Sequence, residues 1–448
     1  MNTSRNLNSK SLENLHTKKP TIYICVEVKN REFYSQILLA EFIARAGFRC
    51  YVGTHAAIFA LLRKKKDKSG IFFDKGTLPK SRMEWIKTKC EFIVVLDQEA
   101  GPTFNDPSKV NAQVLERLYP GSIPLIDRYF CIGPIIYKVA QSLFGKNADK
   151  VKMTGWPRID LFRFYGKEIY SKEIQAIRRK YGKFLLFVSD FPVISMSKKY
   201  VGDGEDFEKT VQLLENAALS IKEWDANNRI LPIIVRPHLT EDPRVWNSLL
   251  GKLKKTEVNK TSEITPWILA SEGVIHRGST TSIQAKLAGK PLYFLDTAAK
   301  IGLNTPQAQI SDFVVNQSNP PLFYSQIANL QVKDDISTGI LKSLILLEHD
   351  PAINRIVQEI VLLSPIHEKS ISASTVILSQ INARAFKRVV GLLLHEIKWI
   401  LKLSVLPPYS AFVPHGLKRK EIERVVLSRG IKDLRTRFVT KNCWEITL

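Results

Sequence analysis

Residues 273–281 read Gly-Val-Ile-His-Arg-Gly-Ser-Thr-Thr, an apolar run that opens into a small turn rich in hydroxyl groups. Residues 282–288 follow with the composition of a helix. Such a succession is typical of a buried strand in a parallel α/β sheet. A second apolar run, residues 231–235, ends in Arg236-Pro237-His238. Because ligands bind at the carboxyl ends of parallel strands and helix N-termini attract anions, the two turns predict a site for a phosphate-bearing ligand.

The same alternation of apolar runs and helical patterns extends in both directions along the chain. We expect strands at residues 21–26, 50–52, 71–73, 91–96, 129–132, 151–154, 184–188, 231–235 and 291–295, and helices at residues 33–46, 56–65, 81–89, 134–144 and 207–225. The pattern predicts an α/β protein in which two Rossmann-like domains, residues 21–165 and 182–330, face each other across a cleft. Residues 163–183 read as a charged, partly helical connector.

Composition limits the class of protein. The chain has 448 residues, 44% of them hydrophobic, and a formal net charge of +23, so its partners are expected to be anionic. Five scattered cysteines show no metal-ligand or redox spacing and are expected to be buried thiols in a reducing compartment. Residues 1–20 are polar and are expected to form a disordered tail rather than a secretory signal. No apolar run is long enough for a transmembrane helix.

The last part of the chain, residues 331–448, is expected to form a mostly helical, basic extension. Residues 384–441 contain fourteen Lys or Arg against four Asp or Glu. Between residues 386 and 402, apolar side chains share one helical face and basic ones another. Two interpretations remain open: the helix packs on the domains with its basic face in solvent, or it binds an anionic membrane surface.

Several polar residues follow predicted strands and are candidates for chemistry. Asp97 and Glu99 end the strand at 91–96, where Glu99 could serve as general base and Asp97 as support, although Asp-rich turns also form for backbone reasons. Asp190 follows the strand at 184–188 as a candidate nucleophile or substrate anchor, or as an ordinary turn residue. Arg236 and His238 offer a fixed cation and a titratable ring.

The strongest predicted anion site is the turn after residue 276. Arg277 supplies charge, Gly278 allows close approach of the backbone, and three hydroxyl groups exceed what a helix cap needs, namely those of Ser279, Thr280 and Thr281. After the first strand, Glu27, Lys29 and Arg31 could contact an acceptor or form a solvated loop. The sequence has no Walker loop, no G-x-G-x-x-G after the first strand and no H-E-x-x-H or G-x-S-x-G motif. Nucleic-acid binding is disfavoured because no aromatic-interleaved basic motif occurs.

The order of the motifs resembles a known family. These motifs are VEVKNREF at 26–33, DQEAG at 97–101, TGWPRID at 154–160, RPH at 236–238, EDP at 241–243, HRGSTT at 276–281 and GKP at 289–291. Over residues 21–300 the chain is similar to bacterial surface carbohydrate (surface polysaccharide) biosynthesis proteins, which have a GT-B glycosyltransferase fold. It also resembles retaining β-Kdo transferases that use CMP-Kdo. Two positions depart from these relatives, Gln284 where many have Glu and Pro192 where many have Gly.

The resemblance implies a metal-independent glycosyltransferase without a cofactor, since the nucleotide-sugar is a substrate. It implies that residues 182–330 bind the nucleotide-sugar, that residues 21–165 bind a lipid-linked or polysaccharide acceptor, and that Glu99 is acid/base and Asp190 the nucleophile. The expected location is cytoplasmic, peripheral on the inner face of the bacterial inner membrane. Two alternatives stay open: a nucleotide-sugar epimerase or hydrolase of the same fold, and a non-catalytic nucleotide-sugar-binding scaffold of a polysaccharide assembly complex.

Overall fold

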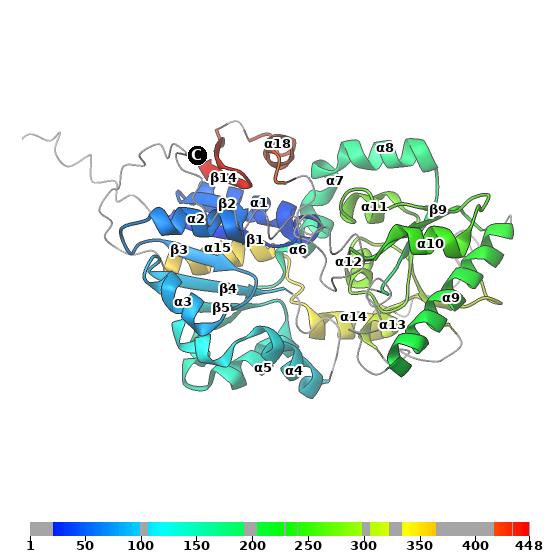
Figure 1. Ribbon diagram of the computed structural model, residues 1–448, viewed down its shortest axis with the longest axis horizontal. Helices are drawn as coiled ribbons and strands as arrows, with labels where there is room; N and C mark the ends of the chain where they lie inside the picture. Colours follow the sequence, from blue (N-terminus) through cyan, green and yellow to red (C-terminus); the bar gives the residue numbers. More distant parts are fainter. Residues whose placement is uncertain are drawn as a thin grey trace, which may run out of the picture.

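Two parallel sheets, side by side along the long axis, form the framework of the protein in a computed structural model (Figure 1). The structure describes residues 21–98, 106–191, 204–227, 230–239, 241–297, 305–321, 334–363, 416–431 and 433–447. Within these ranges every strand of both sheets pairs in parallel except at the C-terminal hairpin. The predicted α/β fold with two Rossmann-like domains is therefore confirmed.

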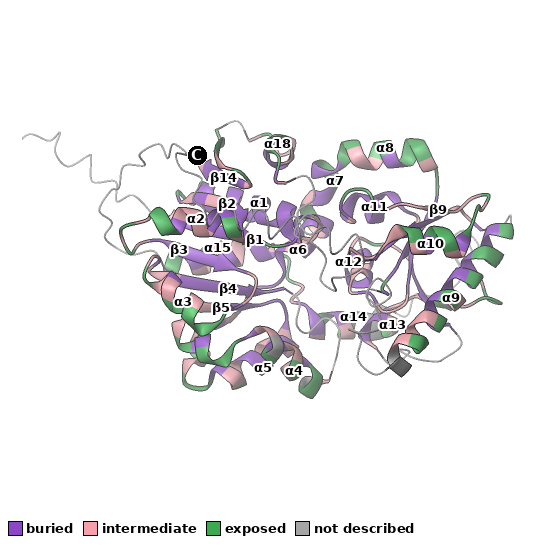
Figure 2. Cartoon of the chain, viewed as in Figure 1, coloured by how far each residue is buried: buried purple, intermediate pink, exposed green. Residues whose placement is uncertain are grey.

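The first sheet has eight strands in the order β13-β14-β2-β1-β3-β4-β5-β6. Its parallel strands are buried on both faces, as the apolar runs predict, and appear purple in Figure 2. The elements in chain order are β1 (Thr21–Val26), α1 (Lys29–Arg45), β2 (Arg49–Thr54), α2 (His55–Lys64), β3 (Ile71–Asp74), α3 (Lys80–Lys87), β4 (Phe92–Asp97), α4 (Pro107–Arg117), a 3₁₀ segment (Pro120–Leu125), β5 (Arg128–Cys131), α5 (Pro134–Phe144), a second 3₁₀ segment (Gly145–Lys150) and β6 (Val151–Met153).

A helical connector leads to the second sheet, which has six strands in the order β12-β11-β10-β7-β8-β9. The connector contains α6 (Pro157–Asp160), a π-helical turn (Leu161–Tyr165), α7 (Gly166–Ile169) and α8 (Ser171–Tyr181). The second domain contains β7 (Leu185–Val188), α9 (Gly204–Ala226), β8 (Ile233–Arg236), α10 (Pro243–Leu250), β9 (Glu257–Val258), α11 (Thr265–Ala270), β10 (Gly273–His276), α12 (Thr281–Leu287), β11 (Leu292–Leu295), α13 (Pro306–Gln309) and β12 (Phe313–Val315).

The hydrophobic core divides at the second sheet. One face of that sheet, with Leu186 and Val274, belongs to the same buried cluster as the first domain. The opposite face, with Phe187 and Ile275, packs with α9 and α10 in a separate cluster. The continuous cluster fixes the two sheets relative to each other, because buried side chains are close-packed and move little.

After the second domain the chain returns to the first. The described elements here are α14 (Asp334–Leu344), α15 (Ala352–Leu362), α18 (Arg419–Ser428), β13 (Arg435–Thr440) and β14 (Cys443–Thr447). Helix α14 packs on α5, α15 packs on α1 and α6, and β14 pairs antiparallel with β2 (Figure 1). The extension expected to be mostly helical therefore contains a β-hairpin that completes the first sheet.

The amphipathic helix predicted at residues 386–402 lies outside the described residues, as does the tail at 1–20. Among the described helices, none has both the length and the apolar composition that crossing a bilayer requires. Membrane association through residues 386–402 thus stays a prediction.

Candidate active site between the two sheets

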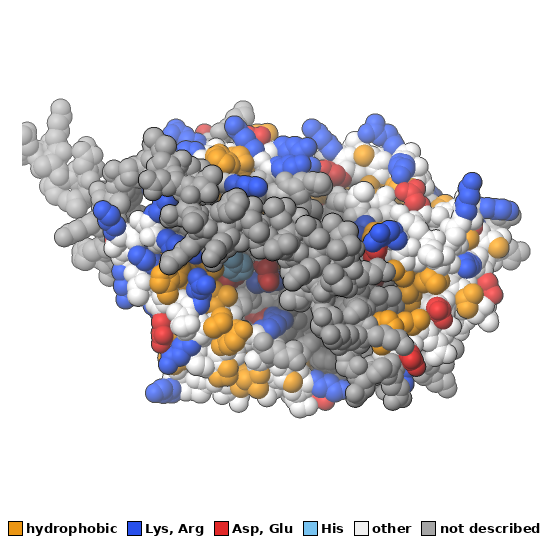
Figure 3. Space-filling view, viewed as in Figure 1, with side chains coloured by type: hydrophobic (Ala, Val, Ile, Leu, Met, Phe, Trp, Pro, Cys, Tyr) orange, Lys and Arg blue, Asp and Glu red, His pale blue; other side chains and the backbone are white. Residues whose placement is uncertain are grey.

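Each sheet has one topological switch point, where successive connections turn to opposite sides. In the first sheet it lies between β1 and β3, because β2 is on one side of β1 and β3 to β6 are on the other. In the second sheet it lies between β7 and β10. Ligands of open α/β sheets bind outside the carboxyl ends of the strands at these points. The space-filling view shows a hollow between the two halves, with acidic and basic side chains at its edge (Figure 3).

Asp190 stands at the switch point of the second sheet, two residues beyond the end of β7. Its turn is held by Glu241, a carboxylate that is only 3% exposed. One Glu241 oxygen accepts a hydrogen bond from the Ser189 hydroxyl at 2.6 Å, and the other accepts one from the backbone N–H of Phe191 at 2.5 Å. The indole of Trp246 also donates to Glu241, at 2.9 Å. The residues on both sides of Asp190 are thereby fixed, which leaves its own side chain at the surface.

Charges from both domains act on Asp190. Its side chain reaches solvent, yet the surrounding protein removes enough hydration, with help from the negative charge of Glu241, to raise its pKa to about 6. Arg31 and Arg277 oppose this shift. Arg31 belongs to the first turn of α1, at the switch point of the first sheet, whereas Arg277 follows β10. The two switch points therefore bring together a carboxylate and two guanidinium groups.

The turn after β10 is shaped by a buried histidine. Burial lowers the pKa of His276 to about 3, so the ring is neutral. Its Nδ1 accepts from the backbone N–H of Gly278 at 3.2 Å, and its Nε2 lies 2.9 Å from the Ser311 hydroxyl. Gly278 has φ +134°, and no atom of another described residue, its chain neighbours apart, lies within 4 Å of the place where its Cβ would be. This positive φ explains the glycine, and the open space above it allows a ligand to approach.

Arg277 lies in this turn, and three hydroxyl residues, Ser279, Thr280 and Thr281, come directly after Gly278. The Arg277 guanidinium lies 5.9 Å from the Phe191 ring centre, and its Nε donates to the Thr297 hydroxyl at 3.3 Å. Burial lowers the pKa of Arg277, whereas Asp190 and Asp296 raise it. Ser279 is buried and its hydroxyl accepts from the N–H of Thr281, the first residue of α12. Thr280 and Thr281 are partly exposed.

Arg236 faces a loop rather than the hollow. Arg236 is 5% exposed, and its guanidinium donates to the backbone oxygens of Asn259, Thr261 and Ser262 at 2.9, 2.6 and 3.0 Å. It also lies over the Trp267 ring, 4.9 Å from the centre. Burial lowers the pKa of Arg236 to about 9. These contacts give Arg236 a loop-supporting position that the sequence does not reveal, and its role as a phosphate ligand stays a prediction. His238, two residues further, is partly exposed.

The predicted acid/base turn after β4 is described only in part. Asp97 is 2% exposed; its carboxylate accepts from the Tyr129 hydroxyl at 2.7 Å and pairs with Arg117. Its neighbour Gln98 accepts from the Trp156 indole at 3.2 Å. Asp97 is therefore buried among its hydrogen-bond partners, and its role as support for the site stays a prediction. Glu99 lies outside the described residues, and its role stays a prediction.

The residues after β1 separate into two groups. Lys29 and Arg31, expected either to contact an acceptor or to lie in a solvated loop, belong to the first turn of α1, which begins at Lys29. Lys29 is buried and pairs with Glu421 of α18 at 2.8 Å, so it supports the C-terminal segment instead of facing an acceptor. Glu27 pairs with Lys75 at 2.6 Å, and its side chain is 50% exposed. Glu27 and Arg31 therefore remain accessible at the switch point.

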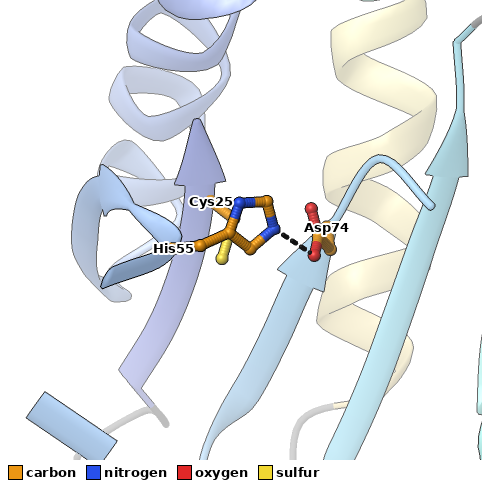
Figure 4. Close-up of side chains that lie close together, drawn as sticks. All are labelled: Cys25, His55 and Asp74. Carbon is orange, nitrogen blue, oxygen red and sulfur yellow. Dashed lines mark hydrogen bonds and ion pairs between the residues drawn. The ribbon is translucent and has the colours of Figure 1, made fainter. Parts of the chain in front are cut away.

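A further group at the same edge carries no motif in the sequence. His55 Nε2 lies 2.7 Å from a carboxylate oxygen of Asp74, and the thiol of Cys25 is close by (Figure 4). The three side chains come from the end of β1, the start of α2 and the end of β3. Their ligand atoms lie within 4.8 Å of one another, which could suit a metal ion. However, the His55–Asp74 hydrogen bond uses one nitrogen, and burial raises the pKa of Cys25 well above its usual value. We therefore assign no metal to this group.

Comparisons with known proteins identify the fold but no family. No protein-family model and no curated protein sequence matches the chain. A crystal structure of UDP-N-acetylglucosamine 2-epimerase is 13% identical over 80% of this chain and all of its own length, with a TM-score of 0.50. The S. aureus MnaA–UDP co-structure is 13% identical over 87% of this chain and 99% of its own, with a TM-score of 0.43.

A structure of the wall teichoic acid polymerase TagF is 11% identical over 77% of this chain and 89% of its own, with a TM-score of 0.44. At such identities only the fold can be compared. The likeness to the epimerase structure agrees with two facing Rossmann-like domains. The chain accordingly has a GT-B type of fold.

Proposed function

We propose that this protein is a glycosyltransferase that moves a sugar from a nucleotide donor to an acceptor in bacterial surface polysaccharide or lipopolysaccharide synthesis. The observation that carries the proposal is Asp190, a carboxylate at one switch point that interacts with Arg277 of its own domain and Arg31 of the other. Glycosyl transfer needs this combination, because a cationic reaction centre and an anionic leaving phosphate must both be stabilised. The resemblance to surface polysaccharide proteins supports the same conclusion.

The nucleotide phosphate belongs on the side of the second sheet. The turn after β10 is formed by Arg277, Gly278 and the hydroxyl residues up to Thr281, the first residue of α12. The open space above Gly278 leaves room for a phosphate there. His238 follows β8, the strand next to β7, and can contact the same phosphate. Protein cations there stabilise the departing charge, so the proposed reaction needs no metal.

Asp190 is the proposed nucleophile if the enzyme retains configuration. With a pKa of about 6, its carboxylate is ionised at neutral pH and can attack the anomeric carbon. The acceptor, lipid-linked or polysaccharide, would then enter from the side of the first sheet. CMP-Kdo is the donor that the sequence resemblance favours.

The first test is nucleotide binding followed by turnover. Thermal unfolding with CMP, CDP, UDP, GDP and ADP should show a selective shift, since a ligand at about 100 times its Kd adds roughly 2.7 kcal/mol of stability. Release of nucleotide from the matching sugar donor is then measured for wild type, Asp190→Asn and Asp149→Asn. Asp149 is an exposed residue before β6, at the opposite edge of the first sheet, and serves as the charge-matched control. We expect at least a 100-fold loss for Asp190→Asn alone; equal rates, or no shift with any nucleotide, would contradict the proposal.

The pH dependence gives a second readout. Nucleophilic attack needs the ionised form, so the rate should fall as pH decreases through about 6. Because Arg277 lowers the pKa of Asp190, the Arg277→Gln variant should lose activity at a higher pH than wild type. If the midpoint of the rate-against-pH profile is the same in this variant as in wild type, Asp190 is not the group that sets the pH dependence.

A nucleotide-sugar epimerase is the second candidate, because the epimerase structure shares this fold with a TM-score of 0.50. It predicts that UDP-N-acetylglucosamine incubated alone changes its configuration at a sugar carbon. A transferase does not change the configuration of the free donor; it only transfers the sugar to an acceptor or to water. Proton NMR of the incubated donor distinguishes the two reactions.

A further inference from the structure

The His55–Asp74 pair occupies the switch point of the first sheet. Asp74 is the last residue of β3 and His55 the first of α2, directly after β2, while β1 lies between these two strands. The pair is thus assembled only by the strand order β2-β1-β3. It lies at the carboxyl edge where an acceptor would meet the first domain, as the proposed function requires.

The two partners differ in exposure. The Asp74 side chain is 4% exposed, whereas that of His55 is 27% exposed. Besides His55, Asp74 accepts from the backbone N–H of Lys75 at 2.8 Å, which fixes the carboxylate. Figure 4 shows the second ring nitrogen of His55, Nδ1, on the side away from Asp74. Among the described residues, Nδ1 has no hydrogen-bond partner. A buried carboxylate that orients a partly exposed imidazole is the arrangement of a proton-transfer pair.

The charges around the pair favour a proton acceptor over an anion-binding group. Asp74, Glu27 and Glu32 act on His55 from the ends of β3 and β1 and from α1, while Lys75 supplies one positive charge beside Glu27 and Glu32. The thiol of Cys25 on β1 remains neutral because burial raises its pKa. These carboxylates repel an anionic ligand and stabilise a protonated imidazole. Partial burial alone would lower the pKa of His55, but Asp74 and the two glutamates raise it to about 9.

The pair also lies near the charged residues of the candidate active site. Glu32 is in the first turn of α1, next to Arg31, and Arg31 interacts with Asp190 of the second domain. Glu32 acts on His55, and its neighbour in the chain, Arg31, acts on Asp190.

We propose that His55, oriented by Asp74, takes the proton from the acceptor hydroxyl during transfer; this inference rests on the proposed function. The acceptor O–H bond breaks and its proton moves to Nδ1 as the oxygen bonds to the anomeric carbon. The bond from that carbon to its leaving oxygen breaks, and the electron pair stays on that oxygen. The leaving oxygen belongs to the phosphate in a single displacement and to Asp190 in a double displacement. Asp74 is a positioning residue, and its carboxylate stabilises the imidazolium that forms.

The test compares donor binding with turnover. Thermal shifts with CMP and UDP, and nucleotide release from CMP-Kdo and UDP-N-acetylglucosamine, are measured for wild type, His55→Gln and His349→Gln. His349 is exposed and belongs to neither switch point, so its variant is the matched control. We expect His55→Gln to keep the nucleotide shift and to lose at least 100-fold in kcat, while His349→Gln retains wild-type rates. In His55→Ala, added imidazole should restore part of the rate, which a purely structural histidine would not allow.

The pH profile tests the positioning role. Wild-type kcat should continue to rise above pH 6, where Asp190 ionises, toward about pH 9, because Nδ1 must also be unprotonated to accept the proton. In Asp74→Asn the rise should move to lower pH, since a charge that raises the pKa of His55 is lost. If wild type turns over a donor and His55→Gln is equally fast, this inference fails and the proposed function stands. If wild type turns over neither donor and none of the five nucleotides shifts its thermal unfolding, both fail.

Discussion

Buried charges near the candidate site hold loops in place, and Arg236 is the clearest example. Three backbone oxygens between residues 259 and 262 receive its N–H groups, and Trp267 covers its flat face. Glu241 acts in the same way on the turn that carries Asp190. In both cases hydrogen bonds to the buried charge reduce the cost of removing it from water, while Nε of Arg236 has no partner among the described residues. The exposed Asp190 depends on these neighbours for its position.

The Arg236→Lys variant tests whether Arg236 supports the loop at residues 259–262 or binds the nucleotide phosphate. A lysine has fewer, differently directed donors, so at least one buried carbonyl loses its partner and the free energy of unfolding should fall by about 2–3 kcal/mol. The nucleotide-dependent thermal shift should persist. Urea unfolding and thermal shifts measure both quantities, with Arg244→Lys as an exposed control. Unchanged stability together with a lost nucleotide shift would instead make Arg236 a phosphate ligand.

At the scale of elements, the segment TGWPRID connects distant parts of the chain. Helix α15 begins after Pro351, which has no polar side chain to cap it. Asp160 of α6 supplies the cap: its carboxylate accepts from the backbone N–H groups of Ala352 and Ile353 at 3.1 and 2.9 Å. Arg355 of α15 in return donates to the backbone oxygen of Thr154 at 2.8 Å. The motif thus docks a C-terminal helix on the first domain.

Removal of this cap should lower the free energy of unfolding by about as much as the loss of a helix N-cap does. For Asp160→Ala we expect a loss of about 1–2 kcal/mol in the free energy of unfolding, and a smaller loss for Asp160→Asn, which keeps one acceptor. Burial raises the pKa of Asp160 to about 7, above its value in the unfolded chain. Folding therefore takes up a proton at Asp160. The stability that this proton uptake contributes is fully present below about pH 4 and is lost as the pH rises through 7. Relative to wild type, Asp160→Asn should gain stability between pH 5 and 8 in urea titrations; a constant difference would refute the raised pKa.

Local patterns predict the elements well but not their long-range contacts. The apolar runs place the strands to within a few residues, because parallel strands buried on both faces need continuous apolar sequence. The start of α1 was missed because Lys29 and Glu32 look solvated, although partners far along the chain bury them. The His55–Asp74 pair has no motif at all, since it depends on β1 lying between β2 and β3. The hairpin was missed because its outer strand is largely polar and exposed.

For the whole molecule, the C-terminal segment ties the first domain to the connector. Strand β14 covers the edge of β2, and the Trp444 indole donates to the backbone oxygen of Leu417 at 3.1 Å. On α18, Arg424 pairs with Glu173 of α8 at 2.5 Å and donates to the Tyr34 hydroxyl of α1 at 3.1 Å. A segment more than 380 residues away in the sequence therefore holds α1. Because α1 carries Arg31 and Glu32, this segment also steadies the proposed acceptor side.

Two glutamates on α18 allow this link to be tested with one matched pair of variants. Glu421 pairs with Lys29, and their side chains are 15% and 6% exposed. Glu423 pairs with Arg419, and their side chains are 35% and 65% exposed. Glu421→Gln removes the carboxylate that pairs with the buried Lys29 ammonium, which also donates to the Gly416 oxygen, so we expect a loss of about 2–4 kcal/mol in the free energy of unfolding. Glu423→Gln should change it by less than about 0.5 kcal/mol, since exposed pairs contribute little. If α18 does steady the start of α1, Glu421→Gln should also lower turnover while the nucleotide shift on the second domain persists. Equal stability of the two variants would show that the Glu421–Lys29 pair does not hold α1.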